Sequence, residues 1–307
     1  MNATFASVAA LAALFSGVLS AADPQLLNLV MPDVKVMADI NVTQAKASPF
    51  GQYALAQLPP QQLEQIAAAT GFDPAHDVTE LLFAGTGAAQ RSGLVLALGN
   101  FNVPTISTAI AKFQAGSETY RGVNIFLDPQ KQGGLAFLSG TVAAAGDLVN
   151  LKAAIDRLSA PAILPPALVA EIGQLSAAND VWALSTVPPA SLKAVAISGL
   201  PGGAGNALGT VQSLSGGVKF GTNVVATVQA QADTAQDAAG IAGLIQFVVN
   251  MAQAKATDEP QVQALAKALT VTADGTAVNL SLTVPSAQLQ ELIQSKSASA
   301  PHAHSHK

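Results

Sequence analysis

Residues 33–42 have the sequence DVKVMADINV, in which apolar and mainly polar side chains alternate. The apolar set is Val34, Val36, Ala38, Ile40 and Val42, and the polar set includes Lys35, Asp39 and Asn41. Because successive side chains of a β-strand point to opposite faces, this period of two predicts a half-buried strand whose valine side faces the core.

The segments that follow alternate between helix and strand signals. Ser48 and Pro49 are typical of a helix start, and Gly71 is typical of the end of a further helix. The next predicted elements are strands at 77–87 and 92–100, a helix capped by Asn102, a hairpin over 123–140 and a helix capped by Asp147.

The second half of the chain repeats this order. Residues 179–195 (NDVWALSTVPPASLKAV) echo residues 32–48 (PDVKVMADINVTQAKAS), and a hairpin with Asp274-Gly275 at its turn precedes a closing helix. We therefore predict an α+β fold of two tandem pseudo-repeats, each a mainly antiparallel sheet with helices packed on one face. Identity between the halves is poor, so a loose alignment of unrelated α+β halves is the alternative.

The predicted boundaries divide the chain into five parts. These are a signal peptide at 1–22, a first α+β repeat at 23–159, a helical connector at 160–180, a second α+β repeat at 181–294 and a disordered, histidine-containing tail at 295–307.

The first 22 residues carry an export signal. An apolar run from Val8 to Leu19 is followed by Ser20 and Ala22, which are small residues at the −3 and −1 positions of a cut before Asp23. No Lys or Arg precedes the run, so either the start lies upstream or the amino terminus alone supplies the positive charge. We expect a periplasmic or extracellular protein with no transmembrane anchor after cleavage.

Composition excludes several classes of protein. Only 11% of the 307 residues are charged, the net charge is −5, and Lys and Arg form no basic stripe, so nucleic acid is not an expected partner. The chain contains no cysteine, so stability must come from core burial rather than disulfides. A second apolar stretch, residues 238–254, is interrupted by Gln246 and Asn250 and is predicted to be a buried core helix.

Several of these motifs resemble a class of uncharacterised exported bacterial proteins that share a domain of unknown function. The motifs are TGFDPAHD (70–77), YRGV (120–123) and the strand-to-helix junction GTVAAAGDLVNLKAAIDR (140–157), and the likeness covers roughly residues 30–290. No enzymatic activity, ligand or cofactor is established for this class, so the resemblance carries none over to this chain.

Standard catalytic chemistry has few candidate residues in this chain. His76 is the one histidine before the last six residues, no G-x-S-x-G or P-loop motif occurs, and there are too few His or Cys residues for a structural zinc site. The glycines Gly203 and Gly205 lack the context of a dinucleotide loop, and Asp258-Glu259 reads as a solvated loop.

Three features remain as candidates. Asp73, His76 and Asp77 are either a carboxylate–imidazole pair or, as we favour, a turn in which Asp73-Pro74 redirects the chain. The alternating tail histidines, His302, His304 and His306, are a candidate weak metal site. The aromatic residues Tyr53, Tyr120 and Trp182 fit core packing better than a ligand platform.

The sequence thus favours an exported, non-enzymatic envelope protein with a binding or structural role and no cofactor. Two alternatives stay open. One is a periplasmic carrier of an apolar ligand or lipid, which would require a large apolar pocket. The other is a hydrolase with an atypical site, which would require His76 in a cleft beside a nucleophile.

Overall fold

The computed structural model describes most of the chain between residues 22 and 298. The described residues are 22–57, 64, 67–68, 71–87, 93–112, 116–188, 208–255 and 260–298. The apolar run Val8–Leu19 and the tail histidines lie outside these residues, so the predictions made for them are untested.

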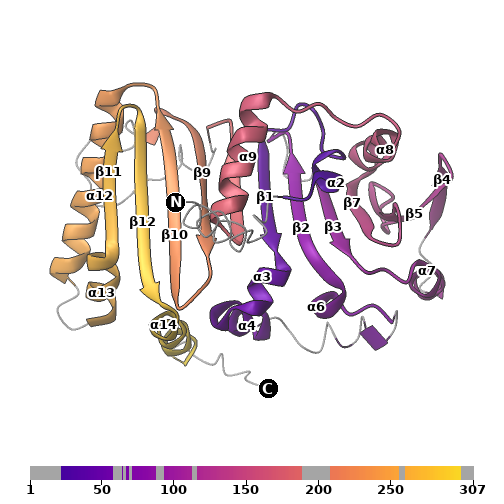
Figure 1. Cartoon of the computed structure of the whole chain (residues 1–307), viewed down its shortest axis with the longest axis horizontal. Helices are drawn as coiled ribbons and strands as arrows, with labels where there is room; N and C mark the ends of the chain where they lie inside the picture. Colours follow the sequence, from indigo (N-terminus) through magenta and orange to yellow (C-terminus); the bar gives the residue numbers. More distant parts are fainter. Residues whose placement is uncertain are drawn as a thin grey trace, which may run out of the picture.

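The described strands form one antiparallel sheet of twelve strands that runs across both halves (Figure 1). Its order is β11-β12-β10-β9-β8-β1-β2-β3-β7-β6-β5-β4. The strands of the first half are β1 (Val36–Asn41), β2 (Val78–Gly85), β3 (Leu94–Gly99), β4 (Ser117–Tyr120), β5 (Val123–Leu127), β6 (Gly133–Phe137) and β7 (Val142–Asp147). Those of the second half are β8 (Val181–Ser185), β9 (Val211–Lys219), β10 (Asn223–Ala232), β11 (Leu269–Asp274) and β12 (Ala277–Pro285).

Helices connect and cover these strands. In the first half they are α2 (Pro24–Leu27), α3 (Val42–Ala47), α4 (Pro49–Ala56), α6 (Pro74–Asp77), α7 (Val103–Lys112) and α8 (Leu148–Arg157). In the second half they are α9 (Pro166–Ala178), α12 (Ala235–Lys255), α13 (Pro260–Ala268) and α14 (Ser286–Ala298). The predicted caps at Ser48 and Asp147 are present: Ser48 Oγ accepts from Gly51 N at 2.9 Å, and Asp147 Oδ1 accepts from Asn150 N at 3.0 Å.

The strand order is symmetric about the β1–β8 pair. Moving outward, β1-β2-β3-β7-β6 on one side matches β8-β9-β10-β12-β11 on the other, and β5 and β4 extend the first half. The predicted α+β class with a mainly antiparallel sheet is confirmed. The symmetric order is what a tandem duplication would produce, although the duplication itself stays a prediction.

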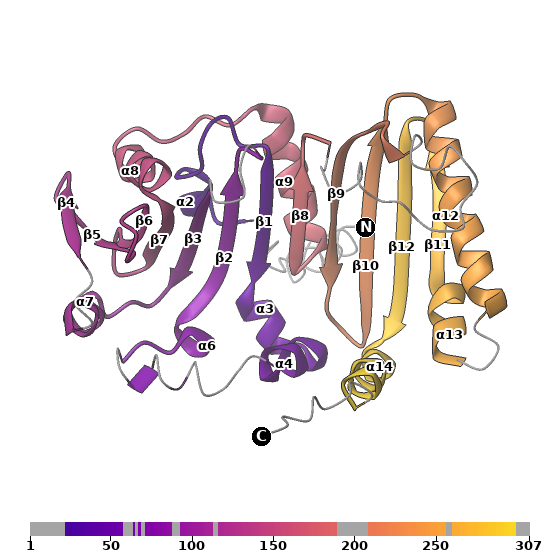
Figure 2. The same cartoon turned by 180° about the vertical axis from the view of Figure 1, so that it is seen from behind.

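The two faces of the sheet are covered by different helices. On one face, here called the α9 face, Met37, Leu82, Leu96 and Trp182 pack beneath α2, α8 and α9 in the main core. On the opposite face, here called the open face, α12 packs over β10–β12 and α7 packs near β3 and β7. The prediction that helices cover one face is therefore corrected: both faces carry helices, over different strands (Figures 1 and 2).

The side of β1 that is buried is also the opposite of the side that the sequence predicted. Met37 and Asp39 face the buried side, whereas Ile40 of the predicted core set is 41% exposed. A period of two identifies a strand but does not say which side a helical layer will cover. Here α2 and α9 cover the side that carries Met37 and Asp39.

Residues 238–254 do form a helix, within α12. Ala238 and Ile241 are buried against β11 and β12 and Ile245 packs beside them, but Phe247 is 46% exposed. The helix thus lies on the sheet surface with one buried stripe, rather than inside the core. No helix in the described part of the chain has the length and apolar character needed to cross a membrane.

Candidate functional site

A groove lies on the open face, over the strands where the two halves meet. Its volume is about 590 Å³, and it is bounded by β1, β8, β9 and β10 and by the segment that follows β8. The lining includes Val181, Ala183, Leu214, Ala226 and Val228. Figure 2 shows no described helix crossing this part of the sheet on the open face.

The two central glycines of β9 help to form the floor of the groove. Gly216 faces the groove, where a Cβ would lie 2.2 Å from Thr227 O. Gly217 faces the α9 side, where a Cβ would lie 2.4 Å from Asn179 Cγ. Since backbone and packed atoms approach so closely, only glycine fits here without a local shift. The sheet therefore presents almost bare backbone between its apolar walls.

A second apolar hollow continues the groove toward the end of the strands. It measures about 330 Å³ and shares Val181, Val218 and Ala226 with the groove. Phe220 and Phe50 close it, with ring centroids 5.8 Å apart. Residues from β8, β9, β10 and β12 thus form a continuous apolar surface that reaches helices α4 and α14.

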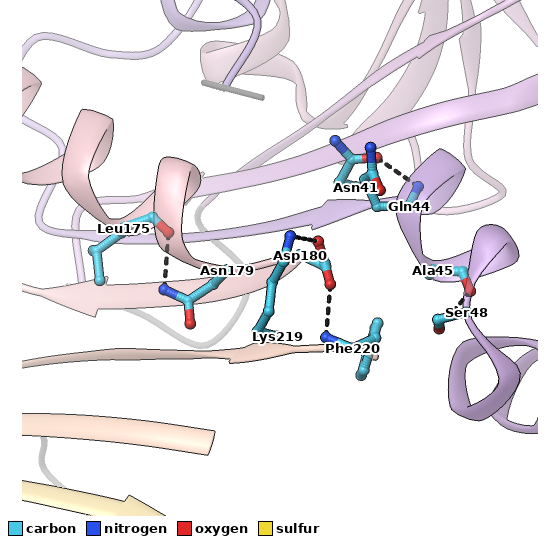
Figure 3. Close-up of polar contacts among 9 residues, drawn as sticks. All are labelled: Asn41, Gln44, Ala45, Ser48, Leu175, Asn179, Asp180, Lys219 and Phe220. Atoms are coloured by element: carbon cyan, nitrogen blue, oxygen red, sulfur yellow. Dashed lines mark hydrogen bonds and ion pairs between the residues drawn. The ribbon is translucent and has the colours of Figure 1, made fainter. Parts of the chain in front are cut away.

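A buried aspartate fixes this end of the groove. Asp180, which is 3% exposed, accepts from Lys219 Nζ at 2.5 Å and from Phe220 N at 2.7 Å (Figure 3). Nearby, Asn179 Nδ2 donates to Leu175 O at 2.8 Å and holds the end of α9 (Figure 3). These contacts position Phe220 and keep the charges off the apolar lining.

On the α9 face, beneath the same central strands, lies a pair of buried carboxyl groups. Asp39 of β1 is 3% exposed and Glu80 of β2 is 9% exposed. Glu80 Oε1 accepts from Asp23 N at 3.0 Å, whereas Asp39 Oδ1 and Trp182 Nε1 have no hydrogen-bond partner in the part of the chain that the structure describes. Asp39 and Trp182 are directly opposite each other in the β1–β8 register.

Burial makes ionisation of this pair costly. Desolvation raises the pKa of Asp39 to about 8, and the neighbouring Glu80 charge and a hydrogen bond to Glu80 add to the effect. The indole N–H of Trp182 lies near enough to Asp39 to lower its pKa slightly, although it does not meet the geometry of a hydrogen bond. Desolvation also raises the pKa of Glu80, but the Asp23 backbone amide opposes the shift. We infer that Asp39 is protonated near neutral pH and that Glu80, which accepts from the Asp23 backbone amide, is the easier of the two to ionise.

The turn that contains His76 has the features of a structural element. The His76 side chain is 82% exposed, and its Nδ1 contacts Asp73 Oδ2 at 2.5 Å. Asp77 Oδ2 accepts from Asp73 N at 2.8 Å, and Gly71 has φ +68°, as expected at a helix end. Among the described residues no nucleophile contacts the imidazole, so the geometry matches the predicted turn.

The three aromatic residues occupy separate places. Trp182 is 1% exposed in the main core, as core packing requires. The Tyr120 hydroxyl is within 3.1 Å of Asp156 Oδ1, and Tyr53 of α4 stacks at a tilt on Phe50, 6.2 Å between centroids. They form no common platform.

The other sequence candidates cannot be placed. His302, His304 and His306 lie outside the described residues, as do Gly203, Gly205, Asp258 and Glu259, so metal binding by the tail stays a prediction. Within the described part of the chain, no group of three or more His, Cys, Asp or Glu side chains could hold a metal ion.

Sequence reasoning missed both the groove and the carboxyl pair. Asp39 was assigned to the polar side of its strand, and Glu80 was not singled out within the strand predicted at 77–87. The one available signal for the groove was the Gly216-Gly217 pair inside a strand pattern, which often marks close backbone approach.

No family model and no curated protein matches this chain. Its fold is similar to that of TP0453, solved in several crystal forms. Form III matches with a TM-score of 0.56, form I with 0.53 and form IV with 0.52, each at 12% identity. For form III, the match covers 88% of this chain and 97% of TP0453. At this identity the likeness shows a shared fold alone, and the resemblance to exported proteins of unknown function stays a prediction.

Proposed function

We propose that the protein is an exported, non-enzymatic binding protein that holds an apolar molecule in the groove on its open face. The groove itself carries the proposal: its volume of about 590 Å³ lies within the range of about 300–1,000 Å³ that is common for small-molecule sites. Export rests on the predicted signal peptide.

The lining chemistry favours an apolar ligand over a polar one. None of the described lining residues is charged, and the hydroxyl of Ser185 already donates to Val187 O at 2.7 Å. A ligand would gain free energy mainly by removing apolar surface from water, at about 25 cal/mol per Å². A charged head group would find no partner in the lining, so it would remain in solvent while an apolar chain occupies the groove.

The open face extends this apolar surface beyond the groove. Ile40 of β1, Phe83 of β2 and Val95 of β3 are each about 40% exposed, and Val228 of β10 is equally exposed within the groove. Contiguous exposed apolar patches on a folded protein commonly mark interaction sites. We read the patch as the approach to the groove.

A non-enzymatic role is supported by the placement of the ionisable groups. Asp39 and Glu80 lie on the α9 face, separated from the groove by the sheet, and His76 lies on an exposed turn. A hydrolase would need a nucleophile and a base that meet at the ligand. The geometry of the described residues therefore favours binding over the hydrolase alternative.

The test uses a dansyl-labelled fatty acid and the fluorescence of Trp182, which is the one tryptophan in the sequence and lies in the strand beneath the groove. We expect saturable energy transfer from Trp182 to the probe. Ala183→Phe, which fills the groove, should weaken binding at least tenfold, or about 1.4 kcal/mol. Lipid extracts of the exported protein, analysed by mass spectrometry, should contain an apolar molecule.

The matched control is Ala273→Phe, the same change at an exposed alanine of the edge strand β11, outside the groove. It should bind the probe as the unmodified protein does. If neither variant affects binding, or if the unmodified protein shows no saturable transfer, the groove is not a ligand site. Hydrolysis of acyl esters that is lost in His76→Ala would favour the hydrolase instead.

A further inference from the structure

The backbone nitrogen of Asp23 occupies an unusual position. It donates to Glu80 Oε1 at 3.0 Å, across more than 50 residues of sequence, and Glu80 is 9% exposed. This is also the nitrogen that the predicted signal-peptidase cut before Asp23 would convert from an amide into a free α-amino group.

The chain near Asp23 is held firmly in place. Asp23 Oδ1 accepts from Gln25 N at 2.7 Å and caps α2, whose first residue is Pro24. The fully buried residues Leu26 and Val30 anchor this segment in the main core. Cleavage before Asp23 would leave these contacts intact, so the new amino group should stay beside Glu80.

Among the described residues, the groups that shift the pKa of Glu80 include no cationic side chain. The titratable groups that interact with Glu80 are Asp39 from β1 and the side chain of Asp23, and both are acidic. Trp182 of β8 contributes an uncharged indole. A buried carboxylate without a positive partner is costly, so an ammonium group at 3.0 Å would offset much of that cost.

We propose that the α-ammonium group of Asp23, formed when the signal peptide is removed, is a structural cation that neutralises Glu80, so that processing stabilises the folded protein. The proposal rests on the predicted cleavage site and is independent of the groove and its ligand. Removing Ala22, which is 4% exposed, also opens space in which water can accept the remaining ammonium protons.

The stabilisation that the ammonium–Glu80 pair provides should depend on pH in a defined direction. An ammonium held by a carboxylate has a raised pKa, so where Glu80 is ionised its stabilisation is present below the unfolded-state value of about 7.7–8.0 and is lost as pH rises through the folded-state value. Protonation of Glu80 removes the pairing at low pH.

The experiment compares proteins with defined first residues, each released from an amino-terminal fusion by a protease that leaves no extra residue. One begins at Asp23 and the other at Ala22, which moves the ammonium one residue, up to about 3.8 Å, away. We expect the unfolding equilibrium constant in urea at pH 6.5 to be at least tenfold larger for the protein that begins at Ala22. The α-amino pKa of the Asp23 form, measured by NMR, should exceed the ordinary value by about one unit.

Glu80→Gln in both proteins supplies the control. With a neutral partner, the difference between the two start sites should shrink to less than threefold. Equal stability of the Asp23 and Ala22 forms with Glu80 present, or a difference that persists unchanged in Glu80→Gln, would overturn the pairing. The cleavage site is tested separately by the mass of the exported protein: a first residue other than Asp23 removes the premise, whatever the urea titrations show.

Discussion

Replacing Asp39 by asparagine should make the protein more stable near pH 8 and flatten the dependence of its stability on pH. Asp39 is 3% exposed, and burial together with Glu80 raises its pKa from 3.8 to about 8. Between these two pH values the folded protein holds one proton that the unfolded chain releases. Stability therefore falls as pH rises across this window.

The size of the change in the free energy of unfolding follows from the shift in the pKa of Asp39. One proton corresponds to about 1.4 kcal/mol per pH unit, and a shift of about four units sets a ceiling of about 6 kcal/mol on the penalty that Asp39 imposes above pH 8. Relaxation and water entry reduce such penalties, so we expect a gain of about 2–4 kcal/mol for Asp39→Asn at pH 8. The asparagine amide can also donate to Glu80, as the protonated carboxyl does.

Urea denaturation at several pH values between 5 and 8 measures both quantities. In a plot of the free energy of unfolding against pH, the slope for Asp39→Asn should be less steep than that of the unmodified protein by the equivalent of about one bound proton. The two plots should approach each other as the pH falls toward 5. Asp274→Asn, at an exposed turn that tolerates asparagine before Gly275, is the matched control and should leave the slope unchanged. Parallel curves for Asp39→Asn and the unmodified protein would refute the assignment of a protonated Asp39.

Asp180→Ala should destabilise the protein by about 1–3 kcal/mol in urea, because it leaves a backbone amide and a lysine without their buried acceptor; a loss below about 0.5 kcal/mol would contradict this. Leu151→Ala, at a fully buried position of α8, should cost about 2–5 kcal/mol, whereas Leu158→Ala, 48% exposed, should change stability by about 0.5 kcal/mol or less. In the turn at Asp73–Asp77, Asp77→Ala should lower the free energy of unfolding by about 1 kcal/mol, because Asp77 Oδ2 no longer accepts from a backbone amide. His76→Ala should leave it nearly unchanged, since the imidazole is exposed. A larger loss for His76→Ala than for Asp77→Ala would indicate a structural role for the imidazole.

The element types were predictable because they depend on local patterns. The period of two in DVKVMADINV, the cap at Asp147 and the turn at Asp73–Asp77 each act within a few residues. The α+β class followed from their order. Each of these features could be read from the sequence without knowing which strands become neighbours.

The candidate site could not be predicted because it depends on long-range pairing. Asp39 and Trp182 face each other only because β1 pairs with β8, and the groove exists because α12 covers β10–β12 and stops short of β8. The prediction of which side of β1 is buried was wrong for the same reason. An alternating strand buries whichever side the helices cover, and in this fold those helices are α2 and the distant α9.

The β1–β8 pairing also has a consequence for how the chain acquires its structure during synthesis. Because synthesis starts at the amino terminus, the first half is made before Val181–Ser185, so β1 lacks its β8 partner during that interval. An open edge beside an apolar face is the kind of surface that pairs with other chains. We therefore expect the incomplete chain to be most prone to aggregation before β8 is made, and pairing of β8 with β1 to end that exposure.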